Sequence, residues 1–261
     1  MDLQFRGKKV LVTGSTAGIG LAIAAALSQE GADVVVNGRT EARVADAVSK
    51  IRINATGSVS GIAADGGTRA GTETLISQLK DVDVLVNNLG IFEPKPFEQI
   101  PDEDWLRFFE VNVLSGVRLS RAFLPGMLKR NWGRIVFISS ESAYQTPAEM
   151  IHYGMTKSAQ VAIARGLAET TAGTGVTVNS VLPGPTRSEG LEGFAQRLSG
   201  GKSFGEFERE FFARVRPTSL LKRFETVEEI GSVVAFVCSP LASGINGAAV
   251  RAEGGVLKSA F

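Results

Sequence analysis

The sequence predicts an α/β fold built on one parallel β-sheet with helices on both of its faces. Short apolar segments rich in valine and isoleucine alternate with longer helical patterns along the 261 residues. Glycine-rich or polar turns follow several of these segments, and in parallel sheets ligands bind there, at the carboxyl ends of the strands. The sequence contains no linker, low-complexity tract or internal repeat. We therefore expect residues 1–261 to form a single domain with a doubly wound sheet of about seven strands.

The first strand and the turn after it indicate a nucleotide site. An apolar strand at 8–13 is followed by Gly14-Ser15-Thr16-Ala17-Gly18-Ile19-Gly20 and then by the helix-forming segment 21–27. Glycines in such a turn let the backbone approach a pyrophosphate, and the helix N-terminus offers free N–H groups to the phosphates. Strand, glycine-rich turn and helix together predict a dinucleotide cofactor.

The second strand, at 31–39, ends on Arg39 and has no carboxylate before Glu41. In dinucleotide-binding folds an acidic residue at this strand end binds the ribose 2′-hydroxyl of NAD, whereas a nearby arginine accommodates the 2′-phosphate of NADP. A guanidinium suits a phosphate better than a neutral diol. We therefore expect NADP(H) to be favoured over NAD(H). A solvated surface arginine is the alternative interpretation of Arg39.

The middle of the chain continues the alternation. The pattern predicts a helix at 41–53, a strand at 58–64 closed by Asp65-Gly66-Gly67, a helix at 69–80, a strand at 82–86 followed by Asn87-Asn88-Leu89-Gly90, and a helical region at 102–129. We expect that helical region to be broken near Pro125-Gly126, because proline interrupts helical hydrogen bonding. It also carries Asn112, and a lone asparagine within a helix is most often bonded to the local backbone.

A proton-transfer site is predicted in the segment 139–157. A strand ends just before Ser139 and Ser140, and the helix that follows carries Tyr153 and Lys157. Their four-residue separation places the phenol and the ammonium on one face of the helix, about one turn apart. Beside a cofactor, a hydroxyl, a phenol and an ammonium together can transfer a proton. Singly, each has a structural alternative: a helix cap for either serine, a core aromatic for Tyr153 and a solvated side chain for Lys157.

The last part of the chain completes the sheet and adds an insertion. The pattern predicts a strand at 133–138, a helix reaching about 171, a strand at 176–182 ending on Pro183-Gly184-Pro185-Thr186, a helix at 226–239 and a strand at 248–252. Thr226 and Glu229 have the spacing of a capping box at the start of the last helix. The stretch 187–217 is charged, aromatic and glycine-rich, so we expect short helices that form a substrate loop or lid. Packing on a neighbouring subunit is the alternative for this stretch.

Composition excludes several classes of function. The 28 basic and 27 acidic residues give a net charge of +1, so there is no electrostatic case for binding nucleic acid or an anionic membrane. One cysteine, Cys238, and one histidine, His152, provide neither a disulfide nor a His/Cys metal site. We expect His152 to be structural or to lie at the substrate edge. The first residues lack the pattern of a signal peptide, and no apolar run approaches the ~18 residues of a membrane span, so we expect a cytoplasmic protein without a metal.

Together these motifs resemble the short-chain dehydrogenase/reductase family, in its compact single-domain form, over essentially the whole chain. The resemblance is carried by Thr13-Gly14-x-x-x-Gly18-Ile19-Gly20, Asn87-Asn88-x-Gly90, Asn112, Ser140, Tyr153-x-x-x-Lys157 and Pro183-Gly184. It implies a Rossmann-type fold and reversible hydride transfer between NAD(P) and a carbonyl compound or alcohol. It also implies a homotetramer or homodimer formed through the long helices.

By this resemblance the catalytic residues are Asn112, Ser140, Tyr153 and Lys157. Tyr153 would be the acid in reduction and the base in oxidation, and the positive charges of Lys157 and the oxidised nicotinamide would lower its pKa from the usual ~10. Lys157 would also bind the nicotinamide ribose, and Ser140 would hold the substrate oxygen. Asn112 would kink its helix by binding a water that connects Lys157 to solvent. The residues expected to bind the cofactor are Gly14, Ser15, Thr16, Gly18, Ile19, Gly20, Arg39, Asp65, Asn88, Gly90, Tyr153, Lys157, Pro183, Gly184, Thr186 and Ser188.

Three positions depart from the family pattern. The usual alanine of the Asn-Asn-Ala-Gly motif is Leu89, whose side chain either crowds the cofactor or packs elsewhere. After Pro183-Gly184, Thr186 and Ser188 replace the usual β-branched aliphatic residue and threonine, and they keep a backbone contact and a hydroxyl. The usual Asp-Gly-Gly near the C-terminus reads Glu253-Gly254-Gly255, for which we expect an effect on packing only.

The predicted function is hydride transfer between a nicotinamide cofactor, with NADPH favoured, and a small carbonyl compound or secondary alcohol. A 3-oxoacyl compound is one candidate substrate. Two other functions stay open: a dinucleotide sensor that has lost turnover, for which Leu89 is the supporting feature, and an epimerase or dehydratase with a retained cofactor. A purely structural subunit has no feature in its favour.

Overall fold

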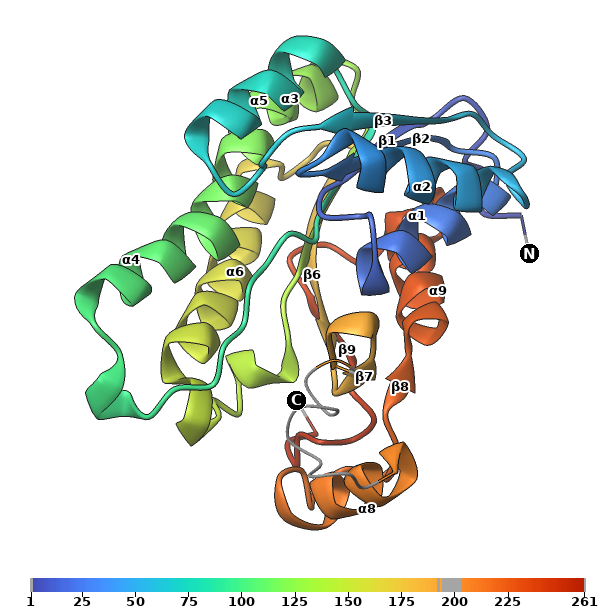
Figure 1. Ribbon diagram of the computed structural model, residues 1–261. Coiled ribbons are helices and arrows are strands. Elements are labelled where there is room, and N and C mark those ends of the chain that lie inside the picture. The colour runs from blue at the N-terminus through green and yellow to red at the C-terminus, as the bar shows by residue number, and fades with distance from the viewer. Residues whose placement is uncertain (1, 192, 194–202, 261) are drawn as a thin grey trace.

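The computed structural model, which describes residues 2–191, 193 and 203–260, has a seven-stranded sheet at its centre (Figure 1). The strand order is β3-β2-β1-β4-β5-β6-β9, and every neighbouring pair is parallel. The strands are β1 Lys9–Val12, β2 Asp33–Gly38, β3 Val59–Ala63, β4 Val84–Asn87, β5 Gly133–Ile138, β6 Val176–Pro183 and β9 Ala249–Ala252. This confirms the doubly wound parallel sheet predicted from the alternating pattern.

The strands read as apolar runs because the sheet is covered on both faces. In the register, Val10 of β1 lies between Val34 of β2 and Val84 of β4. All three side chains are at most 1% exposed. The β-branched side chains suit these pleated surfaces, which are packed from both sides.

Two sets of helices pack on the two faces of the sheet. One face carries α1 Gly18–Gln29, α2 Glu41–Arg52 and α9 Val227–Cys238. The other carries α3 Arg69–Leu79, α5 Ser115–Lys129 and α6 Ile151–Thr170. The helix α9 begins with the predicted capping box, in which Thr226 and Glu229 exchange side-chain and backbone hydrogen bonds. Cys238, at the end of α9, is buried in the core.

The helical region at 102–129 is interrupted at a different place from the one predicted. It consists of α4 Asp102–Phe109, a π-helical turn at Glu110–Leu114, and α5, within which Pro125 lies without a break. The irregularity is therefore centred on Asn112. The side-chain amide of Gln160 donates to the main-chain oxygen of Asn112 (2.6 Å), so this carbonyl bonds to α6. Wider turns of this kind are frequent at functional sites.

The helix α8 Phe204–Arg214 belongs to the stretch 187–217 and lies below the sheet in Figure 1, next to β8 Glu225–Thr226. The short strand β7 Thr186–Arg187 pairs with β8. Residues 192 and 194–202 of the predicted lid lie outside the described residues. Five phenylalanine rings on α8 and just before β8 pack on one another: Phe204, Phe207, Phe211, Phe212 and Phe224. Among the described helices, none is both long and apolar enough to cross a membrane.

Candidate active site

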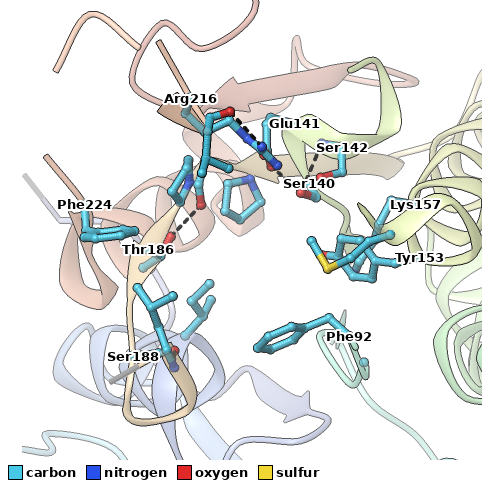
Figure 2. A pocket seen from close by; sticks show the side chains of 18 of the residues that line it. Phe92, Ser140, Glu141, Ser142, Tyr153, Lys157, Thr186, Ser188, Arg216 and Phe224 are labelled. Carbon is cyan, nitrogen blue, oxygen red and sulfur yellow. Dashed lines mark hydrogen bonds and ion pairs between the residues drawn. The ribbon is translucent and has the colours of Figure 1, made fainter. Parts of the chain in front are cut away.

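A cavity of ≈ 690 Å³ opens beyond the carboxyl ends of β4, β5 and β6. Its walls come from the start of α1, the segments that follow these strands, α6 and α8. Figure 2 shows Tyr153 and Lys157 on one side of the cavity and Thr186, Ser188 and Phe224 on the other. The cavity therefore connects the glycine-rich turn with the predicted proton-transfer site.

The glycine-rich turn is tightly packed. Gly14 and Gly18 have φ angles of +60° and +55°, a conformation that glycine adopts without strain. A Cβ on Gly20 would lie 2.4 Å from Nδ2 of Asn88 and 2.5 Å from the carbonyl oxygen of Gly14. The Asn88 amide donates to the carbonyl oxygens of Thr13 (2.9 Å) and Gly14 (3.1 Å). Asn88 thus holds the turn in shape, in addition to lining the cavity.

The first turn of α1 fits the phosphates of a dinucleotide. The helix begins without a side-chain cap and has no acidic residue in its first turn. Its N-terminal N–H groups and the positive end of its dipole are therefore available to an anion. The Ser15 hydroxyl is used internally, because it donates to the Val12 carbonyl oxygen (2.7 Å) and accepts from the Asn37 N–H (3.0 Å). Ile19 lines the cavity.

Arg39 lies at the end of β2, where the adenosine half of a dinucleotide would reach. Its side chain is exposed and makes no ion pair or hydrogen bond with the residues that the structure describes. Thr16 of the glycine-rich turn packs on Gly38, since a Cβ there would come within 2.3 Å of the Thr16 Cγ2. Arg39 therefore directly follows a residue that packs on the glycine-rich turn. Asp65, after β3, is exposed and accepts a hydrogen bond from the Gly67 N–H (3.1 Å).

Tyr153 and Lys157 project from the first turns of α6 toward the cavity (Figure 2). The Lys157 Nζ lies 5.4 Å from the centroid of the Tyr153 ring and donates to the Ile138 carbonyl oxygen (2.9 Å). Burial lowers the pKa of Lys157 to about 8, partly offset by the charge of Glu141. Most of the ammonium is therefore still charged at neutral pH. The Phe92 ring packs edge-on against the Tyr153 ring.

The two neighbouring serines have different partners. The Ser139 hydroxyl donates to the main-chain oxygen of Lys157 (2.8 Å), so it joins the end of β5 to α6. The Ser140 oxygen accepts from the Ser142 N–H (3.1 Å) and its hydroxyl donates to Glu141. A hydrogen bond with Ser140 also lowers the pKa of Tyr153, against the larger effect of burial, which raises it. Of the two serines, Ser140 is therefore the one that affects the proton affinity of the phenol.

Asn112 lies behind Lys157 and braces the segment that follows β4. Its side chain accepts from the Ile91 N–H (2.7 Å) and donates to the Ile91 carbonyl oxygen and to Oγ1 of Thr156 (both 3.0 Å). Gly90 passes between Asn112 and Lys157, because a Cβ there would lie 3.5 Å from the nearest atom of each. The main-chain oxygen of Asn112 accepts a hydrogen bond from the side chain of Gln160. This contact was not predicted from the sequence.

The segment after β6 forms the far wall of the cavity. Pro183, Gly184, Thr186 and Ser188 all line it. The Ser188 Cβ is 3.4 Å from the position that a Cβ on Gly18 would take, so this wall reaches the glycine-rich turn. The Gly184 N–H donates to Glu225 (2.9 Å), whose burial raises its pKa to about 7.

Three residues discussed from the sequence lie outside the cavity wall. His152 is 1% exposed and packs on the rings of Trp105 and Phe108. The Leu89 Cδ1 lies 3.2 Å from the Cβ position of Gly14, so the leucine packs on the glycine-rich turn. Glu253 accepts hydrogen bonds from the main chain at Val256 and Leu257 and pairs with Arg251.

Sequence reasoning missed a buried ion pair in the cavity wall. Glu141 follows Ser140 directly, and its Oε1 lies 3.0 Å from the Nε of Arg216. Both side chains line the cavity and are no more than 7% exposed. A glutamate immediately after the candidate serine was visible in the sequence. Its partner, 75 residues away at the end of the aromatic insertion, had no periodicity or motif that would have identified it.

Comparisons with known proteins agree with this geometry. The family model described as short chain dehydrogenase matches residues 8–198. The oxidoreductase YvaG of Bacillus subtilis, described as uncharacterized, is 48% identical over 100% of both chains. A D-beta-hydroxybutyrate dehydrogenase of Cupriavidus necator is 34% identical, over 97% of this chain and 98% of the relative.

Among solved structures, L-sorbose reductase from Gluconobacter frateurii, complexed with NADPH and L-sorbose, superposes with a TM-score of 0.92. It is 30% identical in sequence and covers 99% of this chain and 100% of its own.

Proposed function

The chain belongs to the short-chain dehydrogenase/reductase family and is an oxidoreductase that uses a nicotinamide cofactor, and we propose that it interconverts a ketone and a secondary alcohol with NADP(H). The observation that carries the proposal is a single cavity that joins the glycine-rich turn to Ser140, Tyr153 and Lys157. The bound nicotinamide supplies the hydride in reduction and accepts it in oxidation.

Tyr153 is the proton donor in the reducing direction. Burial, and then the charge of Glu141, raise the pKa of Tyr153 above its usual range. The phenol is therefore protonated at neutral pH, the form that donates a proton to a developing alkoxide. In the oxidising direction the same group must lose its proton, so alcohol oxidation should increase with pH.

The neighbours of Tyr153 support this role. The Lys157 ammonium, close to the phenol ring, stabilises negative charge as it forms on the phenol oxygen. Ser140 lines the same cavity as Tyr153 and can hold the substrate oxygen beside the phenol. Asn112 acts indirectly, because its three side-chain hydrogen bonds position the chain around Gly90, next to Lys157.

The preference for NADP(H) rests on Arg39. The guanidinium is exposed and has no partner among the described residues, and Arg39 directly follows Gly38, which packs on Thr16 of the glycine-rich turn. A 2′-phosphate there would form charge-assisted hydrogen bonds. Replacing Arg39→Ala should raise the KM for NADPH at least tenfold and leave the KM for NADH nearly unchanged. Equal effects on both cofactors would contradict the role given to Arg39.

The substrate wall is mostly apolar. Phe92, Phe207, Phe211 and Phe224 line the cavity together with Met150. We expect the substrate to be a carbonyl compound with one apolar substituent, and a 3-oxoacyl compound is one member of that class. The name of the Cupriavidus relative, a 3-hydroxy acid dehydrogenase, is in keeping with this expectation.

The experiment that tests the proposal is a panel of ketones and secondary alcohols assayed with NADPH and NADH in parallel. The Tyr153→Phe variant serves as its control: it should lose turnover at least a thousandfold and still bind NADPH. NADPH binding without turnover on the whole panel would instead favour the sensor function. Retained turnover in Tyr153→Phe would refute the assignment of the proton donor.

The oligomeric state is a further expectation from the family. We expect a homodimer or homotetramer. Leu106 and Phe109 lie one turn apart on α4, and their side chains are exposed to 71% and 37% in the single chain. Sedimentation analysis of the purified protein tests this expectation.

A further inference from the structure

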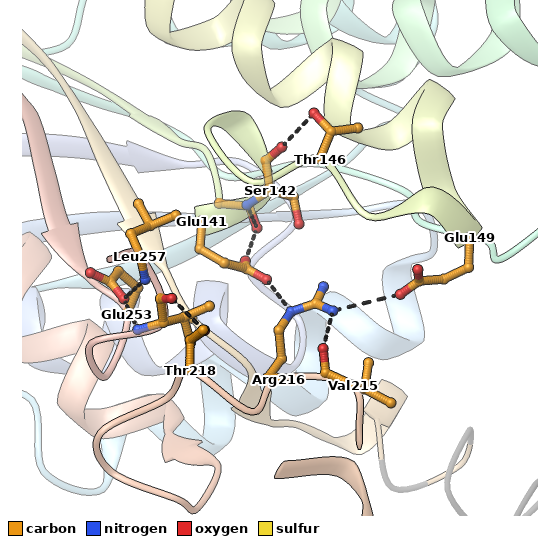
Figure 3. A network of polar contacts seen from close by, with 12 residues as sticks. Glu141, Ser142, Thr146, Glu149, Val215, Arg216, Thr218, Glu253 and Leu257 are labelled. Atoms are coloured by element: carbon orange, nitrogen blue, oxygen red, sulfur yellow. Dashed lines mark hydrogen bonds and ion pairs between the residues drawn. The ribbon is translucent and has the colours of Figure 1, made fainter. Parts of the chain in front are cut away.

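A buried carboxylate competes for the hydroxyl proton of Ser140. The Ser140 hydroxyl donates to Oε2 of Glu141, and Arg216 binds the other carboxylate oxygen, Oε1, at 3.0 Å. Figure 3 shows Arg216 between Glu141 and Glu149, whose oxygen is 3.6 Å from its Nη1. Glu141 and Arg216 are almost fully buried, whereas Glu149 is half-exposed. The carboxylate of Glu141 therefore has two main partners, the serine and the guanidinium.

The arrangement limits what Ser140 can do. A serine hydroxyl has one proton, so it cannot donate to Glu141 and to a substrate oxygen at the same time. The Ser140 oxygen also accepts from the Ser142 N–H, which fixes its position. When the negative charge of Glu141 is not neutralised, its hydrogen bond from the Ser140 hydroxyl is stronger. When the charge is neutralised, this hydrogen bond is weaker and the hydroxyl can donate to a substrate oxygen more easily. Arg216 provides that neutralisation from the segment directly after α8.

We propose that Glu141 and Arg216 are positioning residues for Ser140 and Tyr153: Glu141 directs the serine proton, and Arg216 sets the negative charge that the two hydroxyls experience. The inference rests on the proposed function of this site. Because Arg216 follows α8, whose side chains line the cavity, this part of the chain also controls the charge beside the proton donor.

The charges around Tyr153 support the proposal. Glu141 faces it from the turn after β5, Arg216 from the segment after α8, and Lys157 from its own helix. Glu149 contributes through Arg216. The charge of Glu141 raises the pKa of Tyr153 and that of Arg216 lowers it. An ion pair with a purely structural role would not change the proton affinity of the phenol when its members were replaced one at a time.

The test measures alcohol oxidation against pH for matched variants. Glu141→Gln removes the negative charge, so the rising limb of the profile should move about one unit toward lower pH. Arg216→Met leaves the negative charge of Glu141 without a partner, so the rising limb should move about one unit toward higher pH and kcat should fall at least tenfold. Arg216→Lys keeps the positive charge, so the position of the limb and kcat should both be close to those of the wild type. The double variant Glu141→Gln/Arg216→Met should return the limb close to its original position.

Arg209→Met is the control, because it removes the same positive charge from an exposed residue of α8 that lies outside the cavity wall. This variant should change neither the pH profile nor kcat. Melting temperatures of all variants separate unfolding from the effect on the proton. Lower melting temperatures and lower activity with an unchanged profile would show that the pair only stabilises the fold, and would overturn the proposal.

A second measurement does not depend on turnover. The chain has two tyrosines, so the phenolate absorbance of each protein minus that of its Tyr153→Phe counterpart reports Tyr153 alone. With NADP⁺ bound, Tyr153 should ionise at lower pH in the Glu141→Gln protein than in the Arg216→Met protein. Identical curves overturn the positioning role even if the wild-type protein is active on the carbonyl panel. Separated curves in a protein without activity would support the role of the pair and count against the proposed reaction.

Discussion

Replacing Gly20 by alanine tests whether the glycine-rich turn and Asn88 form one packed unit. The added Cβ would lie 2.4 Å from the Asn88 Nδ2, 2.5 Å from the Gly14 carbonyl oxygen and 3.0 Å from the Ser15 Cα. Two of these three atoms belong to the backbone and cannot move without opening the turn. The Asn88 amide must therefore also move, away from the two carbonyl oxygens to which it donates.

The loss of stability can be estimated from these contacts. Losing two hydrogen bonds of the Asn88 amide costs about 1 kcal/mol each. Forcing a methyl group into a well-packed site adds roughly 1–3 kcal/mol. The total, about 3–5 kcal/mol, should lower the melting temperature of a chain of this size by roughly 6–20 °C. Because the turn is the expected phosphate site, the Kd for NADPH should rise at least a hundredfold.

Thermal unfolding and a fluorescence titration with NADPH measure the two effects. Gly166→Ala is the matched control, because Gly166 is an exposed position within α6 and a Cβ there meets no atom within 4 Å. Alanine is favoured over glycine inside a helix, so this control should stabilise the protein by about 0.5–1 kcal/mol and leave NADPH binding unchanged. A Gly20→Ala protein with native stability and native affinity would refute the packing argument.

Substitutions at three further positions test other contacts. The pKa of Glu225 is raised from its ordinary 4.5 to about 7, so its contribution to stability is complete below the ordinary pKa and is lost as the pH rises through the raised one. Between pH 4.5 and pH 8, denaturant titrations should show the free energy of unfolding of the wild type falling by roughly 2–3 kcal/mol more than that of Glu225→Gln. The same pH dependence in both proteins would contradict this. Thr226→Ala removes the oxygen that caps α9 and should cost about 1 kcal/mol in the same assay, whereas Thr226→Ser should cost little. Asn112→Ala leaves the Ile91 N–H without its partner and should lower stability by on the order of 3 kcal/mol and kcat at least tenfold; native kcat would show that this brace is dispensable.

The strands could be predicted because a buried parallel strand leaves little ambiguity in its residues. Val10, Leu11 and Val12, for example, are fully buried, and a polar residue at any of them would be costly. The glycine-rich turn was equally clear, because positive φ angles at Gly14 and Gly18 exclude most other residues without strain. Local rules determine both features, so the sequence alone was sufficient.

The break in the helical region at 102–129 was misplaced because local rules did not decide it. Pro125 has the properties that normally end a helix, yet it lies inside α5. The irregular turn forms instead at Asn112, where Gln160 of another helix bonds to the main-chain oxygen and Ile91 bonds to the side chain. These partners come from segments that are distant in the sequence. A tertiary contact therefore outweighed a propensity, and no periodicity marked it in advance.

The Glu141–Arg216 pair shows the same limit at the site itself. Tyr153 and Lys157 are four residues apart on one helix, so their proximity follows from helical geometry. Arg216 follows α8, which lies outside the alternating pattern of strands and helices, and only the tertiary fold brings it to Glu141. The segment after α8 therefore places the charge of Arg216 near the Tyr153 and Lys157 pair on α6. Changes in this segment can thus alter proton transfer as well as substrate shape.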